Sequence, residues 1–202
     1  MSQAPEFIRL TPCLALWQAY DPSVKSDLFA TAVKAQAGLF FVDPIPLAPA
    51  ALEDLTGPDP VAGIVLTNSN HLRAAQAFAE RFKAPVFSSA EVAEEFGADW
   101  ARPVADAEEI SPGVSAIAIA GGAPGETAFH FVDQGGTMVV GDALINFEPY
   151  GFTFLPPKYC TDQKEMRRSL GRLLDWPFQR LLFAHGLPIL TSARERLETL
   201  LR

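Results

Sequence analysis

The chain has 202 residues, of which 49% are hydrophobic and 20% charged, and this composition is typical of a folded globular protein rather than a disordered one. Its 24 acidic and 16 basic residues give a net charge of −8 without a basic cluster, which argues against nucleic acid as a partner. The sequence shows neither a signal-like N-terminus nor an apolar segment of membrane-spanning length, so we expect one cytoplasmic domain over residues 1–202 with no membrane partner.

The first half of the sequence predicts strands that alternate with short helices. Apolar runs rich in β-forming residues predict a hairpin with Gly38 at its turn, and the second strand of that hairpin ends at Asp43. Further along, a strand, a helix and a strand form a βαβ unit, which favours parallel pairing. The expected elements are strands at 13–20, 27–35, 38–44, 63–67 and 84–89, and helices at 47–55, from His71 to Lys83 and at 89–96, the last ending at Gly97.

The second half repeats this pattern. Three strands are expected at 113–121, 127–133 and 137–145, and a buried strand at 180–186. Asp162 is expected to cap a helix over 163–175, and Ser192 with Glu195 to form a capping box at the last helix.

Polar residues that could bind a ligand or take part in catalysis follow several of the apolar strands. They are the Asn68–Arg73 segment, Glu126, Asp142 and His185. Strand ends at one rim of a sheet can meet in space although they are distant in sequence, so we expect these residues to converge. Asp142 is equally consistent with a turn aspartate and with a metal ligand or base, whereas His185, at the end of an apolar run, favours a functional role. His130 lies between two phenylalanines inside a strand, which favours a structural role.

These positions carry a resemblance to the metallo-β-lactamase-fold superfamily of hydrolases. "FFVDP" is similar to an early strand of that family, "TNSNHLR" occupies the place of its Thr-His-x-His-x-Asp-His signature, and "PGETAFHF" that of its Pro-Gly-His-Thr loop. "VVGDALI" and "LLFAHGLPIL" resemble its Gly-Asp strand end and its late Gly-His-Gly turn. The resemblance implies an α/β protein with a four-layer αββα sandwich and a site at one edge of its two sheets.

The ligands that the resemblance implies are largely replaced. The family signature supplies three histidines and an aspartate to two metal ions, and this chain has Asn68, Asn70, Leu72 and Arg73 there, with Glu126 for the next histidine. Asp142 and His185 match the expected ligand types. We therefore expect no ordinary dinuclear zinc centre, and no metal in the half of the site that would hold Leu72 and Arg73. The oxygen-rich set of Asn68, Asn70, Glu126 and Asp142 would suit one hard divalent ion. Together with His185, which matches a family ligand type, Asp142 and Glu126 are the candidate metal ligands.

Two functions are compatible with this pattern. The first is a hydrolase with an altered, mononuclear or metal-poor centre, in which His71, His185 and Asp142 are the candidate catalytic residues and the substrate is a small molecule. The second is a non-catalytic relative that binds a small anionic ligand without metal. Its candidate ligand-binding residues are Asn68, Asn70, Arg73 and Glu126, aided by a helix N-terminus near His71 with Asn70 as its cap, and Arg73 can pair with Asp142 or hold the anion.

Overall fold

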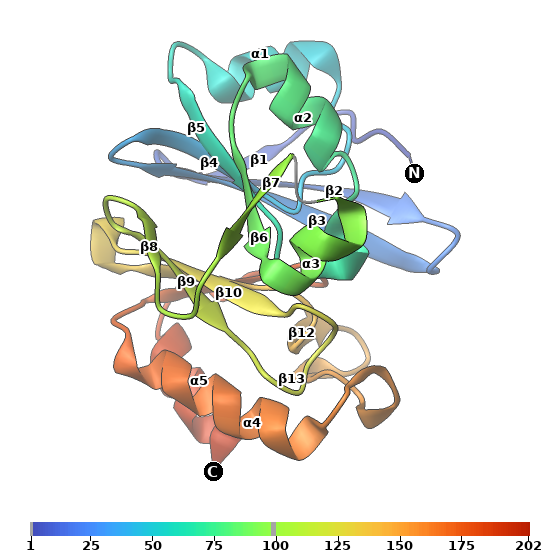
Figure 1. Cartoon of the computed structure of the whole chain (residues 1–202), viewed down its shortest axis with the longest axis vertical. Helices are drawn as coiled ribbons and strands as arrows, with labels where there is room; N and C mark the ends of the chain where they lie inside the picture. The colour runs from blue at the N-terminus through green and yellow to red at the C-terminus, as the bar shows by residue number, and fades with distance from the viewer. Residues whose placement is uncertain (1, 98–99) are drawn as a thin grey trace.

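The apolar strands of the first half pair into one mixed sheet, which we describe from a computed structural model covering residues 2–97 and 100–202 (Figure 1). The antiparallel strands β1 to β4 are continued by β5, β6 and β7, which run parallel to β4. The strands, in spatial order, are β1 (Ile8–Thr11), β2 (Leu14–Asp21), β3 (Ser26–Ala35), β4 (Gly38–Val42), β5 (Val61–Val65), β6 (Val86–Ser89) and β7 (Ala101–Val104).

The second half forms a five-stranded sheet and a small separate hairpin. The order in the sheet is β14 (Arg180–Phe183), β11 (Thr137–Val140), β10 (Thr127–Phe131), β9 (Val114–Ala118) and β8 (Glu109–Ser111), with β14 and β11 parallel and the others antiparallel. The hairpin consists of β12 (Leu144–Phe147) and β13 (Gly151–Phe154). The run expected as one strand at 137–145 is thus two strands, separated by the turn that carries Asp142.

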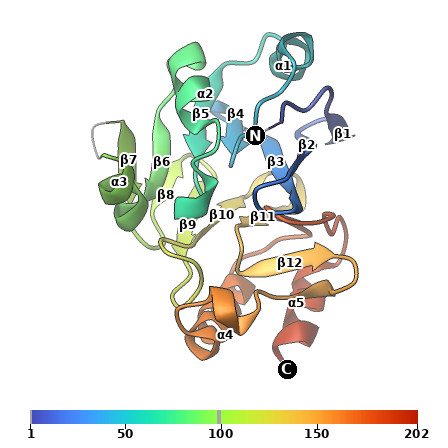
Figure 2. The ribbon, with the colours of Figure 1, turned by 90° about the vertical axis from the view of Figure 1, so that its right-hand side faces the viewer.

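Helices cover the outer face of each sheet, so the molecule has four layers (Figures 1 and 2). On the first sheet lie α1 (Pro49–Thr56), α2 (Ala75–Phe82) and α3 (Ala90–Phe96), and on the second lie α4 (Gln163–Gly171) and α5 (Ala193–Leu201). No helix in the described ranges is long and apolar enough to cross a membrane. The fold predicted by the resemblance, an αββα sandwich, is confirmed.

Strand β4 shows why its sequence is continuously apolar. Phe41 points to the outer layer, where its ring packs edge-on to Phe78 of α2 at 5.0 Å between centroids. Phe40 points the other way and meets Phe131 of the second sheet, with 5.9 Å between centroids. Both side chains are fully buried, because a central strand with a helix on one face and a sheet on the other needs apolar residues on both.

Several expected boundaries differ in the structure. The helix predicted from His71 begins only at Ala75, after a 3-10 turn over Ser69–His71, because Arg73 has a left-handed backbone (φ 40°) that interrupts the helix. The capping box at Ser192 is wrong, since Ser192 also has positive φ and its side chain makes no capping hydrogen bond. Strands β1, β7, β8 and β13, all at sheet edges, were not predicted.

Candidate functional site

The predicted polar residues meet at one rim of the two sheets, and Asp43 and Thr67, which were not in the predicted set, join them there. Asp43 follows β4, the Thr67–His71 segment follows β5, and Glu126 precedes β10. Asp142 follows β11, and His185 lies two residues after the end of β14. Convergence of the strand ends, which the sequence predicted, is confirmed by the contacts between them.

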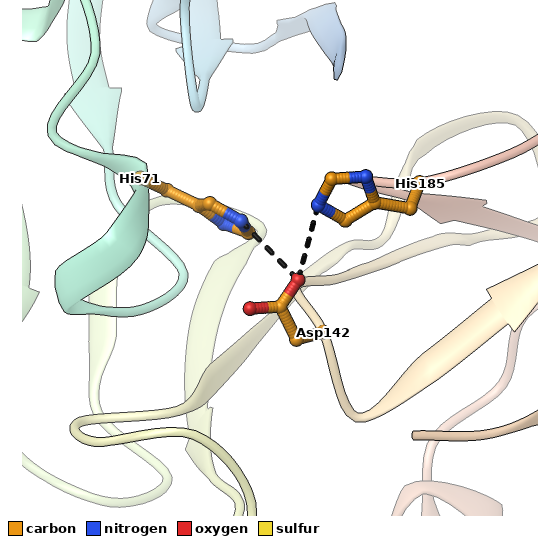
Figure 3. A group of neighbouring side chains, drawn as sticks. All are labelled: His71, Asp142 and His185. Carbon is orange, nitrogen blue, oxygen red and sulfur yellow. Dashed lines mark ion pairs between the residues drawn. The ribbon is translucent and has the colours of Figure 1, made fainter. Parts of the chain in front are cut away.

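Three side chains form the centre of the site (Figure 3). The Nε2 atoms of His71 and His185 each lie 3.3 Å from Asp142 Oδ1, so both rings point at the same carboxylate oxygen. The side chains are 2%, 11% and 18% exposed for His71, Asp142 and His185 in turn, so solvent reaches the cluster from the His185 side. One ligand atom from each residue lies within 4.8 Å of the others, an arrangement that can hold a metal ion.

The second nitrogen of each histidine is already engaged with oxygen acceptors. His71 Nδ1 lies 2.7 Å from Thr67 Oγ1 and 3.0 Å from Asp43 Oδ2. His185 Nδ1 lies 3.2 Å from the backbone oxygen of Asp27. A ring that donates through Nδ1 presents an unprotonated Nε2, which is the usual tautomer of a metal-ligating histidine.

Asp43 is the residue that fixes His71. Its Oδ1 accepts the backbone N–H of Thr67 at 2.9 Å and its Oδ2 accepts the Thr67 hydroxyl at 2.5 Å. These bonds hold the end of β5 against the end of β4 and leave Asp43 Oδ2 facing the imidazole. The sequence placed Asp43 at a strand end but assigned it no role.

The buried charges of the site stabilise one another. Burial opposes ionisation of Asp43 and Asp142, but the charge of His71 and hydrogen bonds from its ring, joined at Asp142 by a hydrogen bond from His185, outweigh it. Both carboxyls therefore have lowered pKa values, that of Asp142 well below its usual range. Burial and the charge of Arg73 oppose protonation of His71, but Asp142 and Asp43 together raise its pKa to about 9. At neutral pH a proton on His71 therefore supplies positive charge between the two carboxylates.

Two asparagines occupy the other half of the site. Asn68 Nδ2 donates to Glu126 Oε2 at 2.8 Å and to Asp142 Oδ2 at 3.1 Å, and Asn70 Nδ2 donates to Asp142 Oδ2 at 3.3 Å. Glu126 Oε1 accepts the backbone N–H of Ala143 at 3.0 Å, and burial and the charge of Asp142 raise the pKa of Glu126 to about 8. Amide donors thus bridge the two carboxyl groups.

Gly141 allows these groups to approach so closely. A Cβ at this position would lie 2.5 Å from Thr67 Oγ1, 2.8 Å from Glu126 Oε1 and 2.9 Å from Asn68 Nδ2. Because real Cβ atoms do not come so near, only glycine fits without displacing the polar network.

Arg73 does not make the direct pair with Asp142 that the sequence suggested. Its NH1 donates instead to the backbone oxygens of Phe29, at 2.7 Å, and Asp43, at 3.2 Å. Its NH2 is buried and, in the described part of the chain, has no hydrogen-bond partner. The left-handed backbone of Arg73 directs this side chain toward β3 and the end of β4.

The grouping of the site residues in the structure differs from the grouping predicted from the sequence. The half of the site expected to lack metal contains the three gathered donors, because His71 turns inward while Leu72 packs against the apolar core. Glu126, predicted as a ligand, is hydrogen-bonded to Asn68 and Ala143 and lies outside that group. Asn68, rather than Asn70, caps the short turn by accepting from Asn70 N at 2.9 Å, and the expected helix N-terminus near His71 is a three-residue 3-10 turn. His130 has the structural role expected for it, since its Nε2 lies 2.7 Å from Pro177 O.

Comparisons with known proteins agree with this fold. The family model of the metallo-β-lactamase superfamily matches residues 9–202. A metallo-β-lactamase from Pontibacter korlensis superposes with a TM-score of 0.71 at 15% identity, covering 97% of this chain and 98% of that one. A metallo-β-lactamase family protein from Thermus thermophilus gives 0.63 at 22% identity, covering 95% and 79%. The protein TTHA1623, solved in a di-iron-bound form, gives 0.61 at 21% identity, covering 89% and 97%. No curated protein matches the chain significantly.

Proposed function

Because the chain belongs to the metallo-β-lactamase superfamily, we propose that it is a hydrolase whose centre holds one divalent metal ion on His71, Asp142 and His185. The observation that carries the proposal is the convergence of two imidazole Nε2 atoms on one carboxylate oxygen, each at 3.3 Å. His71 Nε2 is buried and, in the described ranges, has no hydrogen-bond partner of good geometry; Asp142 Oδ1, at 3.3 Å, is its ion-pair partner.

The three residues fit a metal by their chemistry. Two neutral imidazoles and a carboxylate are ligands that zinc and related ions accept in catalytic sites with an open position. Both Nδ1 atoms face oxygen acceptors, so the two Nε2 atoms and Asp142 Oδ1 face one another as three electron-pair donors. Because these lone pairs repel one another, a cation between them would stabilise the cluster. In the metal-free protein the proton on His71 supplies this positive charge, and a divalent ion would displace it. When bound, the ion would supply a Lewis acid and lower the pKa of a coordinated water.

The asparagines support one ion rather than two. Asn68 Nδ2 lies between Glu126 and Asp142 and donates a hydrogen bond to an oxygen of each. These N–H groups engage oxygen lone pairs that a second cation would otherwise bind. TTHA1623 binds two irons on a similar fold, which supports a metal in this chain. The amides in the neighbouring half favour a mononuclear, altered centre here.

The surrounding residues position the reacting groups. Asp43 and Thr67 hold the His71 ring, and the Asp27 carbonyl holds that of His185. Asp142 Oδ2 is occupied by the two asparagine amides, so Oδ1 is the oxygen presented to the centre. The partly exposed edge of His185 marks the side from which a substrate would arrive.

The test begins with metal content. Purified protein, stripped with a chelator and titrated with Zn²⁺, Mn²⁺ or Fe²⁺, is expected to bind one ion per chain. It is then assayed with ester, lactone, β-lactam and phosphodiester substrates. His71→Ala and His185→Ala are expected to abolish both binding and turnover, while His130→Gln, which changes the remaining histidine, retains them. A folded protein that binds no divalent ion, or that turns over none of these substrates in any metal form, would refute the proposal.

The metal-free alternative rests on a different atom. Arg73 NH2 is a buried donor without a partner in the described part of the chain, and an anion reaching it would gain a charge-assisted hydrogen bond. If the site binds an anion without metal, phosphate or sulfate is expected to raise the melting temperature of the protein, and Arg73→Met to remove this increase. Chelators are then expected to leave the melting temperature unchanged. A melting temperature that falls on chelation favours the metal centre instead.

A further inference from the structure

A cleft of about 490 Å³ adjoins His185 on the Nδ1 side of its ring. Ser26 and Asp27, which contact Nδ1 at 3.5 and 3.2 Å, line the cleft, and so does Gly186, the residue after His185. Leu187 follows Gly186 in the lining, and the other lining residues come from β2, the β2–β3 turn, β3 and the end of β12 with the residue after it, elements that lie on the same side of the molecule in Figure 2. A volume of this size suits a small molecule rather than a macromolecule.

Backbone contacts fix the wall of the cleft beside His185. Asn146 N donates to His185 O at 3.2 Å, and Leu187 N donates to Asn146 O at 2.9 Å. Gly186 between them has φ 111°, and a Cβ there would lie 2.1 Å from Asn146 O. Only glycine permits this approach, so the chain that carries His185 and Leu187 is held rigidly against β12.

Four large apolar or aromatic side chains share the lining of the cleft with five polar or charged ones, and two of the four are exposed. Tyr20 is 53% and Leu187 65% exposed, and Phe29 and Phe147 complete the apolar lining. The Phe147 ring packs edge-on against Tyr150, with 5.6 Å between centroids. Large apolar side chains that remain exposed around a concave site indicate that an apolar ligand covers them.

The charges of the cleft disfavour an anion. Lys25 is the basic residue of the lining, against the carboxylates of Asp27 and Glu148. The whole chain adds a net charge of −8. Among the lining side chains alone, a ligand with a carboxylate or phosphate would therefore meet one more negative than positive group, an unfavourable balance that an uncharged ligand avoids.

We propose that this cleft binds the apolar body of an uncharged substrate, namely an alkyl or aryl carboxylic ester whose carbonyl reaches the His71–Asp142–His185 cluster. The proposal rests on the hydrolase function above. In the reaction, water adds to the carbonyl carbon, the acyl–oxygen bond breaks, and the alcohol leaves with the proton, giving one acid and one alcohol. The cleft thus selects esters over anionic substrates through Tyr20, Leu187 and the excess of carboxylates.

Binding of non-hydrolysable analogues tests the cleft without turnover. Hexanophenone and 6-oxo-6-phenylhexanoate differ in a terminal methyl or carboxylate, and their affinities for metal-loaded protein can be compared by ligand-observed NMR. We expect the uncharged ketone to bind about tenfold more tightly, the effect of roughly one unfavourable charge contact. Glu148→Lys is expected to erase or invert this preference and Leu187→Ser to weaken both ligands, whereas Glu53→Lys, an equal change of charge on α1, leaves the preference intact.

The outcomes separate the two proposals. Equal or tighter binding of the carboxylate by the wild type, a preference unaffected by Glu148→Lys, or no binding of either ketone would overturn the assignment of the cleft. If the ketone preference holds but phenyl hexanoate is not hydrolysed in any metal form, the cleft assignment stands and the hydrolase function fails. Hydrolysis of phenyl hexanoate about tenfold faster, in kcat/KM, than of its terminally carboxylated counterpart supports both.

Discussion

Replacing Asp43 with asparagine tests how the site positions His71. The side chain of Asp43 accepts from Thr67 N at 2.9 Å and from Thr67 Oγ1 at 2.5 Å, and its Oδ2 lies 3.0 Å from His71 Nδ1. Asparagine has nearly the same shape, but one of its two terminal atoms is a donor. In Asp43→Asn at least one of the three partners therefore faces an N–H group instead of an oxygen, and the negative charge behind the imidazole is lost.

The expected effect on metal binding follows from this contact. Loss of a carboxylate behind a ligating histidine weakens metal affinity by about 10- to 100-fold, or about 1.4–2.8 kcal/mol. A second effect acts on folding, because the buried charges of Arg73 and protonated His71 lose a counter-ion. Breaking such a buried pair costs about 3–5 kcal/mol, so the metal-free variant is expected to unfold at clearly lower urea concentration.

Two measurements separate these effects. Zinc affinity is measured by competition with a chromophoric chelator near neutral pH, at a temperature where circular dichroism shows the variant to be folded. The free energy of unfolding is measured by urea titration of the chelated protein. Asp59→Asn, which removes a carboxylate from a partly exposed pair with Lys34, is the control and is expected to change stability by less than about 1 kcal/mol and zinc affinity not at all. Zinc affinity within about twofold of the wild type in Asp43→Asn would refute the role assigned to Asp43.

Four further predictions concern the same centre. Gly141→Ala, whose methyl would meet Thr67 Oγ1 at 2.5 Å, should lower the free energy of unfolding by about 1–3 kcal/mol, whereas Gly171→Ala, with nothing within 4 Å, should not. Zinc binding at neutral pH should release about one proton from His71, seen as a calorimetric enthalpy that depends on the buffer; an enthalpy independent of the buffer would contradict this. Because the pKa of His71 is raised from 6.5 to about 9, its contribution to metal-free stability should be full below about pH 6.5 and lost as pH rises through about 9, which urea titrations across this range measure. Asn68→Asp, which replaces the bridging donor with a third carboxylate, should melt at lower temperature without metal and gain a second metal equivalent; one equivalent in both proteins would count against amide replacement of a cation.

The sequence predicted most of the sheet and helix elements because their signals are local. Apolar runs ended by glycine, proline or aspartate located the central strands, and Asp162 caps α4 as expected, accepting from Lys164 N at 2.9 Å. The edge strands β1, β7, β8 and β13 were not predicted, since a short strand on a sheet edge is defined by its partner more than by its own pattern. The turn at Arg73 was missed for a related reason, because a positive φ at a non-glycine residue is imposed by tertiary contacts.

The sequence predicted that the candidate site is formed by a set of strand ends. It did not predict which side chains of the site contact one another. Order and spacing of the motifs along the chain determined the fold and showed that Asp142, His185 and the segment after β5 share one rim. Which side chain of that segment faces the centre depends on backbone angles and on distant partners. Asp43 and Thr67 turn His71 inward, and the carbonyls of Phe29 and Asp43 draw Arg73 away from Asp142. Apart from Thr67, those partners lie far from this segment in sequence, 44 residues in the case of Phe29 and Arg73, so only the tertiary structure could decide that His71, and not Arg73, joins Asp142 and His185.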